Sequence, residues 1–256
     1  MLQVRTRILY NKEVKENYFH LAVHAPKITK EALPGQFLNI KVNDAFEPLL
    51  RRPLSIHRIK GANIELLYEV VGKATRILSQ RKPGECLDII GPLGNGFTLR
   101  NSGHKKLNIL VAGGMGVAPL LFLAEKLAGR KPLVLIGAKN KKSLSCIEEF
   151  KKIGCAAKIA TDDGSSGFKG YVSELLNNEL STMNHELSTI YACGPRPMLK
   201  EITRLAKKHN IPVQVSLEEH MACGIGACLG CTVNTKEGFK RVCKEGPVFN
   251  GDEIIW

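Results

Sequence analysis

Four cysteines near the C-terminus constrain this chain more than any other feature of its sequence. Their spacing is Cys223-x4-Cys228-x2-Cys231-x11-Cys243. The pattern C-x4-C-x2-C…C is typical of loops that bind a [2Fe–2S] cluster through four thiolates. Three glycines lie between the first three cysteines, and glycine lets a backbone curl closely around a cluster and aim its N–H groups at sulfur. We therefore predict that these four cysteines are the metal ligands of a loop-rich C-terminal segment.

Two alternatives stay open for the same cysteines: a structural zinc site, or reduced thiols without metal. Zinc ribbons usually present two paired cysteine knuckles, whereas here Cys243 stands alone and His220 is the only nearby imidazole. The spacing therefore favours iron and sulfide. The remaining cysteines are scattered singly and are expected to be ordinary thiols: Cys86, Cys146, Cys155 and Cys193.

The net charge of +13 raises nucleic acid, an anionic membrane or phosphate-bearing ligands as partners. Residues 213–256, which hold the cysteine loop, carry four basic and six acidic side chains, so this segment is not a basic nucleic-acid module. The longest apolar run, 109–124, contains three glycines and a proline and is shorter than the ~20 residues of a membrane helix. No apolar signal segment opens the sequence. We expect a cytoplasmic protein that binds neither nucleic acid nor membrane.

Two different patterns of apolar residues divide the rest of the chain. Residues 1–100 contain short β-type runs separated by turn formers, which predicts an antiparallel barrel or sandwich; the runs are 2–9, 18–24, 36–42, 54–59, 64–71 and 86–90. Residues 101–212 alternate apolar strands with amphipathic helices, which predicts a parallel α/β sheet; the expected helices are 116–128, 143–152, 170–180 and 197–208. With 213–256, this gives three domains.

Two glycine-containing turns in the α/β part predict a dinucleotide site. Gly113, Gly114 and Gly116 lie between an expected strand and an expected helix, where glycine permits close approach of the backbone to a pyrophosphate and the helix N-terminus favours its charge. The turn is weak evidence alone, because Pro119 stands where a Rossmann fingerprint has its third glycine. A second turn ends a later strand of the same sheet and strengthens the prediction: Cys193, Gly194 and Pro195.

The β-rich part offers groups suited to phosphate. Arg51, Arg52 and Ser55 combine charge with a hydroxyl. Residues 72–75 begin an expected short helix. For one isolated pair of arginines, a solvated β surface is an equally simple explanation, so these residues need support from the rest of the chain.

The order of the motifs along the chain supplies that support. PGQF (34–37), RRPLS (51–55), GKAT (72–75), GPLGNGF (91–97), GGMGVAP (113–119) and CGP (193–195) precede the four cysteines. In this order the sequence resembles the ferredoxin–NADP reductase superfamily, and more narrowly the electron-transfer subunits of dihydroorotate dehydrogenase B.

The resemblance implies an N-terminal FAD-binding β-barrel, a central NADH-binding α/β domain and a small C-terminal [2Fe–2S] domain. It implies that Arg52, Pro53, Leu54 and Ser55 hold the flavin pyrophosphate and ribityl region. It also places a second group of residues beside the flavin and its phosphate: Glu69, Val70, Val71, Ala74 and Thr75. Two of these depart from the family pattern, because glycine is common at Ala74 and a basic residue is frequent at Glu69.

The function implied is that of an oxidoreductase component without an acid–base residue of its own. Hydride from NADH passes to FAD, and single electrons pass through the cluster to FMN on a separate dihydroorotate dehydrogenase subunit, in a heterotetramer of two plus two. The alternatives are the small subunit of a bifurcating NADH-dependent ferredoxin–NADP reductase, in which Asp tends to replace the first cysteine, and a self-contained reductase. Lys139, Lys141 and Lys142 leave NADPH open as the donor.

Overall fold

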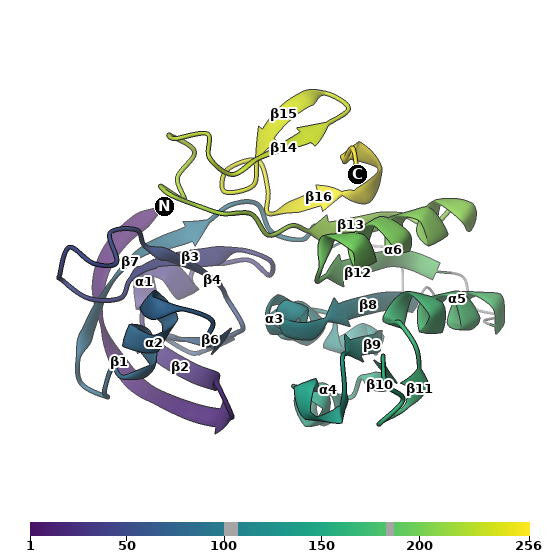
Figure 1. Cartoon of the computed structure of the whole chain (residues 1–256), viewed down its shortest axis with the longest axis horizontal. Coiled ribbons are helices and arrows are strands. Elements are labelled where there is room, and N and C mark those ends of the chain that lie inside the picture. Colours follow the sequence, from purple (N-terminus) through teal and green to yellow (C-terminus); the bar gives the residue numbers. More distant parts are fainter. Residues whose placement is uncertain (100–106, 183–186) are drawn as a thin grey trace.

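The computed structural model of the chain describes residues 1–99, 107–182 and 187–256. Two seven-stranded sheets lie side by side, and a two-stranded hairpin lies over the junction between them (Figure 1). In the described residues no helix is long and apolar enough to span a membrane. The expected boundary between residues 100 and 101 lies outside the described residues.

The first sheet is antiparallel and strongly curled, as the alternation of its side chains predicts. Its strands run in the order β4-β3-β7-β1-β2-β6-β5, and β4 also contacts β6 across the open side, which gives a half-barrel. The strands are β1 (Leu2–Lys15), β2 (Tyr18–His24), β3 (Phe37–Lys41), β4 (Arg52–Ser55), β5 (Arg58–Lys60), β6 (Asn63–Glu69) and β7 (Cys86–Leu93), with short helices α1 (Pro26–Thr29) and α2 (Lys73–Ser79).

One expected strand, 54–59, is in fact two. The backbone N–H of Ile56 still bonds to Gln36 at the start of β3, whereas that of His57 bonds to Glu65 in β6. The chain therefore changes its partner strand between β4 and β5. Both Ile56 and His57 are buried at this corner.

The second sheet is the parallel α/β sheet that the sequence predicts. Its order is β11-β10-β9-β8-β12-β13-β16, and all pairs are parallel except β13 with β16. Its strands are β8 (Leu107–Gly113), β9 (Leu133–Ala138), β10 (Ala156–Thr161), β11 (Phe168–Lys169), β12 (Leu187–Cys193), β13 (Val213–Ser216) and β16 (Val248–Asn250). Successive strands are added on one side of β8 as far as β11, and β12 is then added on the other side. The order of strand addition therefore reverses between β8 and β12.

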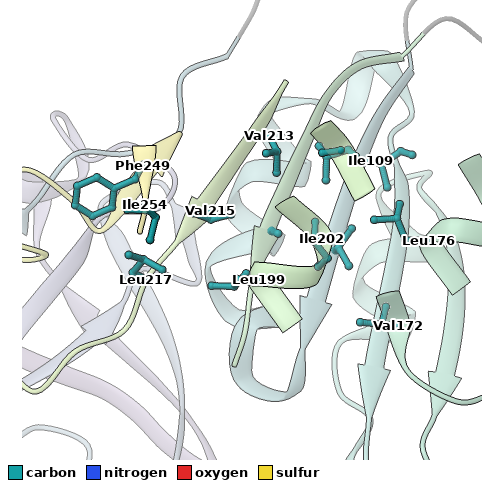
Figure 2. Packing of buried hydrophobic residues seen from close by; sticks show 14 of the residues in the cluster. Ile109, Val172, Leu176, Leu199, Ile202, Val213, Val215, Leu217, Phe249 and Ile254 are labelled. Atoms are coloured by element: carbon teal, nitrogen blue, oxygen red, sulfur yellow. The ribbon is translucent and has the colours of Figure 1, made fainter. Parts of the chain in front are cut away.

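Helices cover both faces of this sheet. Buried residues of α5 (Val172–Thr182) and α6 (Arg196–Lys208) pack against one face, where Figure 2 shows Leu176 and Ile202 close to Ile109 of β8. Residues of α3 (Val117–Lys126) and α4 (Ile147–Lys152) pack against the other face. The same cluster that α5 and α6 cover continues to Leu217, Phe249 and Ile254 of the C-terminal segment.

The C-terminal segment joins both sheets. It contains the hairpin β14 (Thr232–Thr235) and β15 (Gly238–Arg241), drawn in yellow in Figure 1, and then contributes β16 to the α/β sheet. The buried cluster that contains Cys231 and Cys243 also contains Phe37 and Leu93 of the half-barrel. The cysteine segment therefore packs on the outer side of β3 and β7 rather than standing apart.

Helix α3 connects the half-barrel to the α/β sheet. Phe122 of α3 belongs to the buried cluster of the half-barrel. The Nδ1 atom of His57 lies 2.9 Å from the carbonyl oxygen of Ala118, and Arg58 forms an ion pair with Glu125. Because α3 begins directly after the first glycine turn, these contacts fix that turn relative to the half-barrel.

Candidate cofactor-binding sites

The two glycine turns predicted from the sequence contact each other in the structure. A Cβ atom on Gly116 would lie closer than 3.0 Å to the carbonyl oxygen of Cys193, and one on Gly194 would lie 3.0 Å from the Cα of Gly113. On Gly113, a Cβ would lie 2.5 Å from the Sδ of Met198 in α6. Gly116 and Gly194 leave room for the close approach of the two turns at the ends of β8 and β12, and Gly113 leaves room for the side chain of Met198.

Gly114 has a different role in the same turn. Its φ of +54° lies in the left-handed region, and open space surrounds the position of its absent Cβ. It leads into the ten-residue helix α3 at the carboxyl ends of β8 and β12, where the strand order reverses. In open α/β sheets this crevice is where dinucleotides bind. The geometry fits a pyrophosphate approached by backbone N–H groups.

Cys193 is a buried thiol rather than a nucleophile. Its side chain is 1% exposed. Burial raises its pKa well above the usual range, the nearby carboxylate of Glu218 raises it further, and a hydrogen bond with Ser216 opposes both effects. A thiol held neutral in this way packs the turn and is a poor nucleophile.

The predicted flavin segment 52–55 forms β4, an edge strand of the half-barrel. Its residues are half-buried and pair with β3, with Pro53 opposite Asn39 and Ser55 opposite Phe37. The guanidinium of Arg52 donates to the carbonyl oxygens of Leu50 and Arg51. This folds the Arg52 side chain over its own loop at the open edge of the sheet.

Arg51 is not available for phosphate, contrary to the expectation for the arginine pair. Its Nη1 donates to the carbonyl oxygen of Asp88 and its Nη2 to the carboxylate of Asp88, both at 2.8 Å. The Asp88 carboxylate is partly buried, which raises its pKa, but the bonds from Arg51 and Gln3 lower it overall. Arg51 therefore fastens the loop before β4 to β7, which leaves Arg52 as the arginine of the pair for the candidate site.

The second flavin segment lies at the end of β6 and the start of α2. The hydroxyl of Thr75 accepts hydrogen bonds from the N–H groups of Val71 and Gly72 at 3.0 and 3.2 Å. The methyl group of Ala74 is 2% exposed and belongs to the core of the half-barrel. It therefore points into the core rather than toward solvent.

The end of β6 also holds Glu69 and two valines. Glu69 pairs with Tyr18 of β2, whose pKa is raised first by burial and then by the Glu69 carboxylate. The backbone N–H of Val70 bonds to Asn17, and the side chain of Val71 is exposed. Because β4 contacts β6, the two predicted flavin segments lie on neighbouring strands across the open side of the half-barrel.

The four cysteines occupy one tight loop and the turn after β15. Their sulfur atoms accept backbone N–H groups in a connected pattern. The N–H of Cys228 lies 3.4 Å from the Sγ of Cys223, and the N–H of Cys243 lies 3.4 Å from the Sγ of Cys231. The N–H of Gly226 lies 3.1 Å from the Sγ of Cys243. Such bonds stabilise thiolates bound to iron.

The cysteines form two pairs, Cys223 with Cys228 and Cys231 with Cys243. Among the residues that the structure describes, no three His, Cys, Asp or Glu side chains are grouped as around a single metal ion. In a [2Fe–2S] cluster each iron takes two protein thiolates, which matches two pairs of cysteines. The loop also contains Gly224, Gly226 and Leu229 at positive φ, which curls it around this position. The residues present fit the two-iron cluster.

Comparison with known proteins decides the family. Residues 218–255 match the family model of the iron–sulfur cluster binding domain of dihydroorotate dehydrogenase B, and 110–204 match that of the oxidoreductase NAD-binding domain. The chain is 44% identical over 252 residues to the dihydroorotate dehydrogenase B (NAD(+)) electron transfer subunit of Desulforamulus reducens, covering 95% of this chain and 94% of the relative. The corresponding subunit of Caldanaerobacter subterraneus is 37% identical, with 99% of each chain covered.

The chain belongs to the family of dihydroorotate dehydrogenase B electron transfer subunits. Among solved structures, it is similar to a chain of an NADH-dependent reduced ferredoxin–NADP oxidoreductase studied for flavin-based electron bifurcation. That chain is 34% identical, has a TM-score of 0.86 and is matched over 98% of this chain and 90% of its own length. The family resemblance stated from the motifs is confirmed.

Two residues beside the cluster loop of this family member were not predicted from the sequence. Asn39 of β3 donates its amide to the carbonyl oxygen of Cys223, and Arg241 of β15 donates to the carbonyl oxygen of Gly226. Both act on backbone atoms of a distant segment. No spacing rule or motif identifies such contacts.

A cavity of about 810 Å³ lies where the half-barrel, β13, β16 and the C-terminal segment meet. It is lined in part by Gln36, Thr98, Gln214 and Lys240, and none of the predicted site residues lines it. The cavity is therefore separate from the glycine turns and from the cysteine loop.

Proposed function

We propose that this chain is the electron-transfer subunit of a dihydroorotate dehydrogenase B. It takes hydride from NADH onto FAD and relays single electrons through a [2Fe–2S] cluster to, or from, FMN on a separate catalytic subunit. The observation that carries the proposal is the packing of the cysteine loop on β3, whose neighbouring strand β4 holds the flavin segment. Names of relatives that contain NAD(+) support NADH as the donor.

The residues of this chain would position the two nucleotides. Arg52 and Ser55 of β4 would bind the flavin pyrophosphate and ribityl region, with Pro53 and Leu54 forming the strand against which the flavin lies. Gly114, at the start of α3, would receive the pyrophosphate of NADH. The contacts of α3 with His57 and Arg58 hold these two sites in a fixed relation.

The other proposed contacts complete each site. Gly113, Gly116, Gly194 and Pro195 would shape the nicotinamide crevice, with Cys193 as its buried wall. Glu69, Val70 and Val71 would border the flavin, and the backbone at Ala74 and the Thr75 turn would face its phosphate. When bound, FAD would accept two electrons together, whereas the iron–sulfur cluster accepts one electron at a time. The protein supplies binding and orientation.

At the cluster, we propose that Cys223 and Cys228 hold one iron and that Cys231 and Cys243 hold the other. The hydrogen-bonded pairs of cysteines support this assignment. The backbone N–H of Gly226 would stabilise the Cys243 thiolate. These thiols must stay reduced to bind iron, which suits a cytoplasmic location.

We retain three functional modules: residues 1–100 for FAD, 101–212 for NADH and 213–256 for the cluster. The division is by ligand, since β13 and β16 of the third module complete the sheet of the second. The partner would be an FMN-containing catalytic subunit, in a heterotetramer of two plus two. The exposed side chains of Ile225 and Leu229 on the cysteine loop offer it an apolar surface beside the cluster.

A second candidate is the small subunit of a bifurcating NADH-dependent ferredoxin–NADP reductase. The TM-score of 0.86 to such a protein favours it. The first cysteine of the loop argues the other way, because members of that group tend to have Asp at the position of Cys223. Identification of the flavoprotein that co-purifies with the native chain separates the two candidates.

The function is tested by assaying the flavin- and iron-loaded chain with and without its partner. Alone, it should oxidise NADH with an artificial acceptor and should not oxidise dihydroorotate. Addition of the FMN-containing catalytic subunit should allow dihydroorotate to reduce NAD⁺. Orotate formation by this chain alone would contradict the proposal.

A further inference from the structure

Arg241 ties two parts of the cysteine loop together. At the end of β15, its Nη1 donates to the carbonyl oxygen of Gly226 at 2.6 Å. The N–H of the same residue, Gly226, donates to the Sγ of Cys243 at 3.1 Å. Arg241 thus holds the residue whose N–H donates to the sulfur of Cys243, which lies two residues beyond Arg241 in the chain.

A carboxylate holds the guanidinium in this position. Glu245 accepts from the Nε of Arg241 at 2.9 Å and from its backbone N–H at 2.8 Å, and it also pairs with Nη2. The two side chains are 26% and 32% exposed. The guanidinium and the carboxylate therefore form a close ion pair beside the cysteine loop.

The guanidinium also lies close to the proposed cysteine ligands. It bonds to the carbonyl oxygen of Gly226, whose N–H bonds to the Cys243 sulfur, and Arg241 is two residues from Cys243 in the chain. Reduction adds negative charge to an iron–sulfur cluster, and its potential depends on net charge and on hydrogen bonds to sulfur. A fixed positive charge and an N–H···S bond both favour the reduced form.

We propose that Arg241 is a positioning residue that raises the reduction potential of the [2Fe–2S] cluster. It does so by holding Gly226 on the Cys243 sulfur and by placing positive charge beside the Cys231–Cys243 pair. Glu245 limits the effect by partly neutralising that charge. The proposal rests on the proposed function, in that it requires the cluster to be bound by these cysteines.

The alternative is that Arg241 and Glu245 only fasten the hairpin, as exposed ion pairs commonly do with little energetic effect. The two roles predict different signs for the shifts of the cluster potential in two variants. If Arg241 acts through charge, removal of the cation and removal of the anion move the potential in opposite directions. If the pair is only structural, both variants disturb the loop in the same way.

The test is a redox titration of the loaded chain, followed by the electron paramagnetic resonance signal of the reduced cluster. Arg241→Met should lower the midpoint potential, and Glu245→Gln should raise it. For Arg241→Met we expect about a tenfold change in the one-electron equilibrium constant, which corresponds to about 59 mV. Arg204→Met is the matched control, because Arg204 makes a similar forked bond to Glu201 on α6. The cluster in this variant should have the same midpoint potential as in the parent chain.

Iron and sulfide analysis accompanies each titration. If Arg241→Met fails to load the cluster, Glu245→Gln decides the question alone: it keeps the guanidinium and removes the charge that offsets it, so its potential should rise. Unchanged potentials in fully loaded variants, or shifts of the same sign, overturn the proposal. A parent chain that binds no iron overturns the proposed function instead.

Discussion

The side-chain amide of Asn39 donates a hydrogen bond of 3.0 Å to the backbone carbonyl oxygen of Cys223. Asn39 is 1% exposed, and its backbone pairs with Pro53 of the proposed flavin strand. Its Oδ1 is buried without a hydrogen-bond partner among the described residues, which costs about 1–3 kcal/mol. Asn39 therefore links β3 to the cysteine loop through a buried side chain.

Replacement of Asn39 by leucine tests this link. The variant loses the donor and the unpartnered oxygen together, so its free energy of unfolding should change little. The cysteine loop, however, loses its fixed position against β3. In stopped-flow experiments, NADH should reduce the flavin at the parental rate, whereas reduction of the cluster should be about tenfold slower.

Gln214→Leu provides the comparison for that experiment. Gln214 is another buried amide that links two parts of the chain, through the backbone N–H and carbonyl oxygen of Thr98. It does not touch the cysteine loop. Slower cluster reduction in Gln214→Leu, or a parental rate in Asn39→Leu, would show that Asn39 has no special role.

The glycines of the nucleotide turn should respond differently to alanine. In Gly116→Ala the new methyl group meets the carbonyl oxygen of Cys193, so we expect a loss of about 3 kcal/mol of stability. In Gly114→Ala the methyl group meets no atom, and the positive φ costs about 1 kcal/mol. Because that methyl lies where the pyrophosphate should approach, the KM for NADH should rise. Thermal unfolding and steady-state kinetics measure the two effects.

Gly129→Ala is the control for both variants, because a Cβ at Gly129 also meets no atom and its φ is ordinary. Its free energy of unfolding should stay within about 1 kcal/mol of the parent value, and its KM for NADH should be unchanged. A normal KM in Gly114→Ala would mean that NADH binds elsewhere.

The stability of the chain should fall as pH falls from about 6.5 to about 4. Burial lowers the pKa of His57 to about 4, and the bond to Ala118 opposes this effect; His20, Arg58 and Glu65 face the ring. Because the folded pKa lies below the unfolded value of 6.5, the unfolded state takes up the proton first. The loss should be on the order of 3 kcal/mol. Urea denaturation at several pH values measures it.

In His57→Asn, the free energy of unfolding should depend less on pH between 6.5 and 4, whatever the stability of the variant at pH 7. Below pH 4.5 both proteins should still lose stability as Glu65 is protonated, because bonds from His20 and Lys60 outweigh burial and lower its pKa to about 2. An unchanged slope between pH 6.5 and 4 in the variant would assign the effect to other groups.

Serine substitutions should separate the cluster ligands from the other thiols. Replacement of Cys223, Cys228, Cys231 or Cys243 should remove the cluster, with loss of iron and of visible absorption. Cys155→Ser and Cys193→Ser change buried thiols outside the loop, so these variants should keep their iron even if they unfold more easily. Iron retained after replacement of Cys243 would disprove the ligand set.

Local sequence rules predicted the elements whose structure depends on near neighbours. The strand 18–24 was found at the same bounds as β2, and the two glycine turns lie where a strand meets a helix. Alternation and glycine placement are properties of a few adjacent residues, so the sequence carries them directly.

Contacts between distant segments could not be predicted in this way. Nothing near Arg51 indicates that it, and not Arg52, binds Asp88 of β7. Strand β16 is too short to recognise, and it exists because β13 offers an edge to pair with. Asn39 and Arg241 act on the backbone of the cysteine loop from β3 and β15. Each depends on contacts between segments that are not adjacent in the sequence.

The central claim is that electrons from NADH reach the cysteine loop through the flavin of this same chain. The direct measurement is anaerobic addition of NADH to the loaded chain without its partner, followed by rapid freezing and electron paramagnetic resonance. Loss of the oxidised flavin absorption followed by the signal of a reduced [2Fe–2S] cluster is the predicted result. A bleached flavin beside a cluster that stays oxidised, or a chain that holds flavin but no iron, would contradict the account.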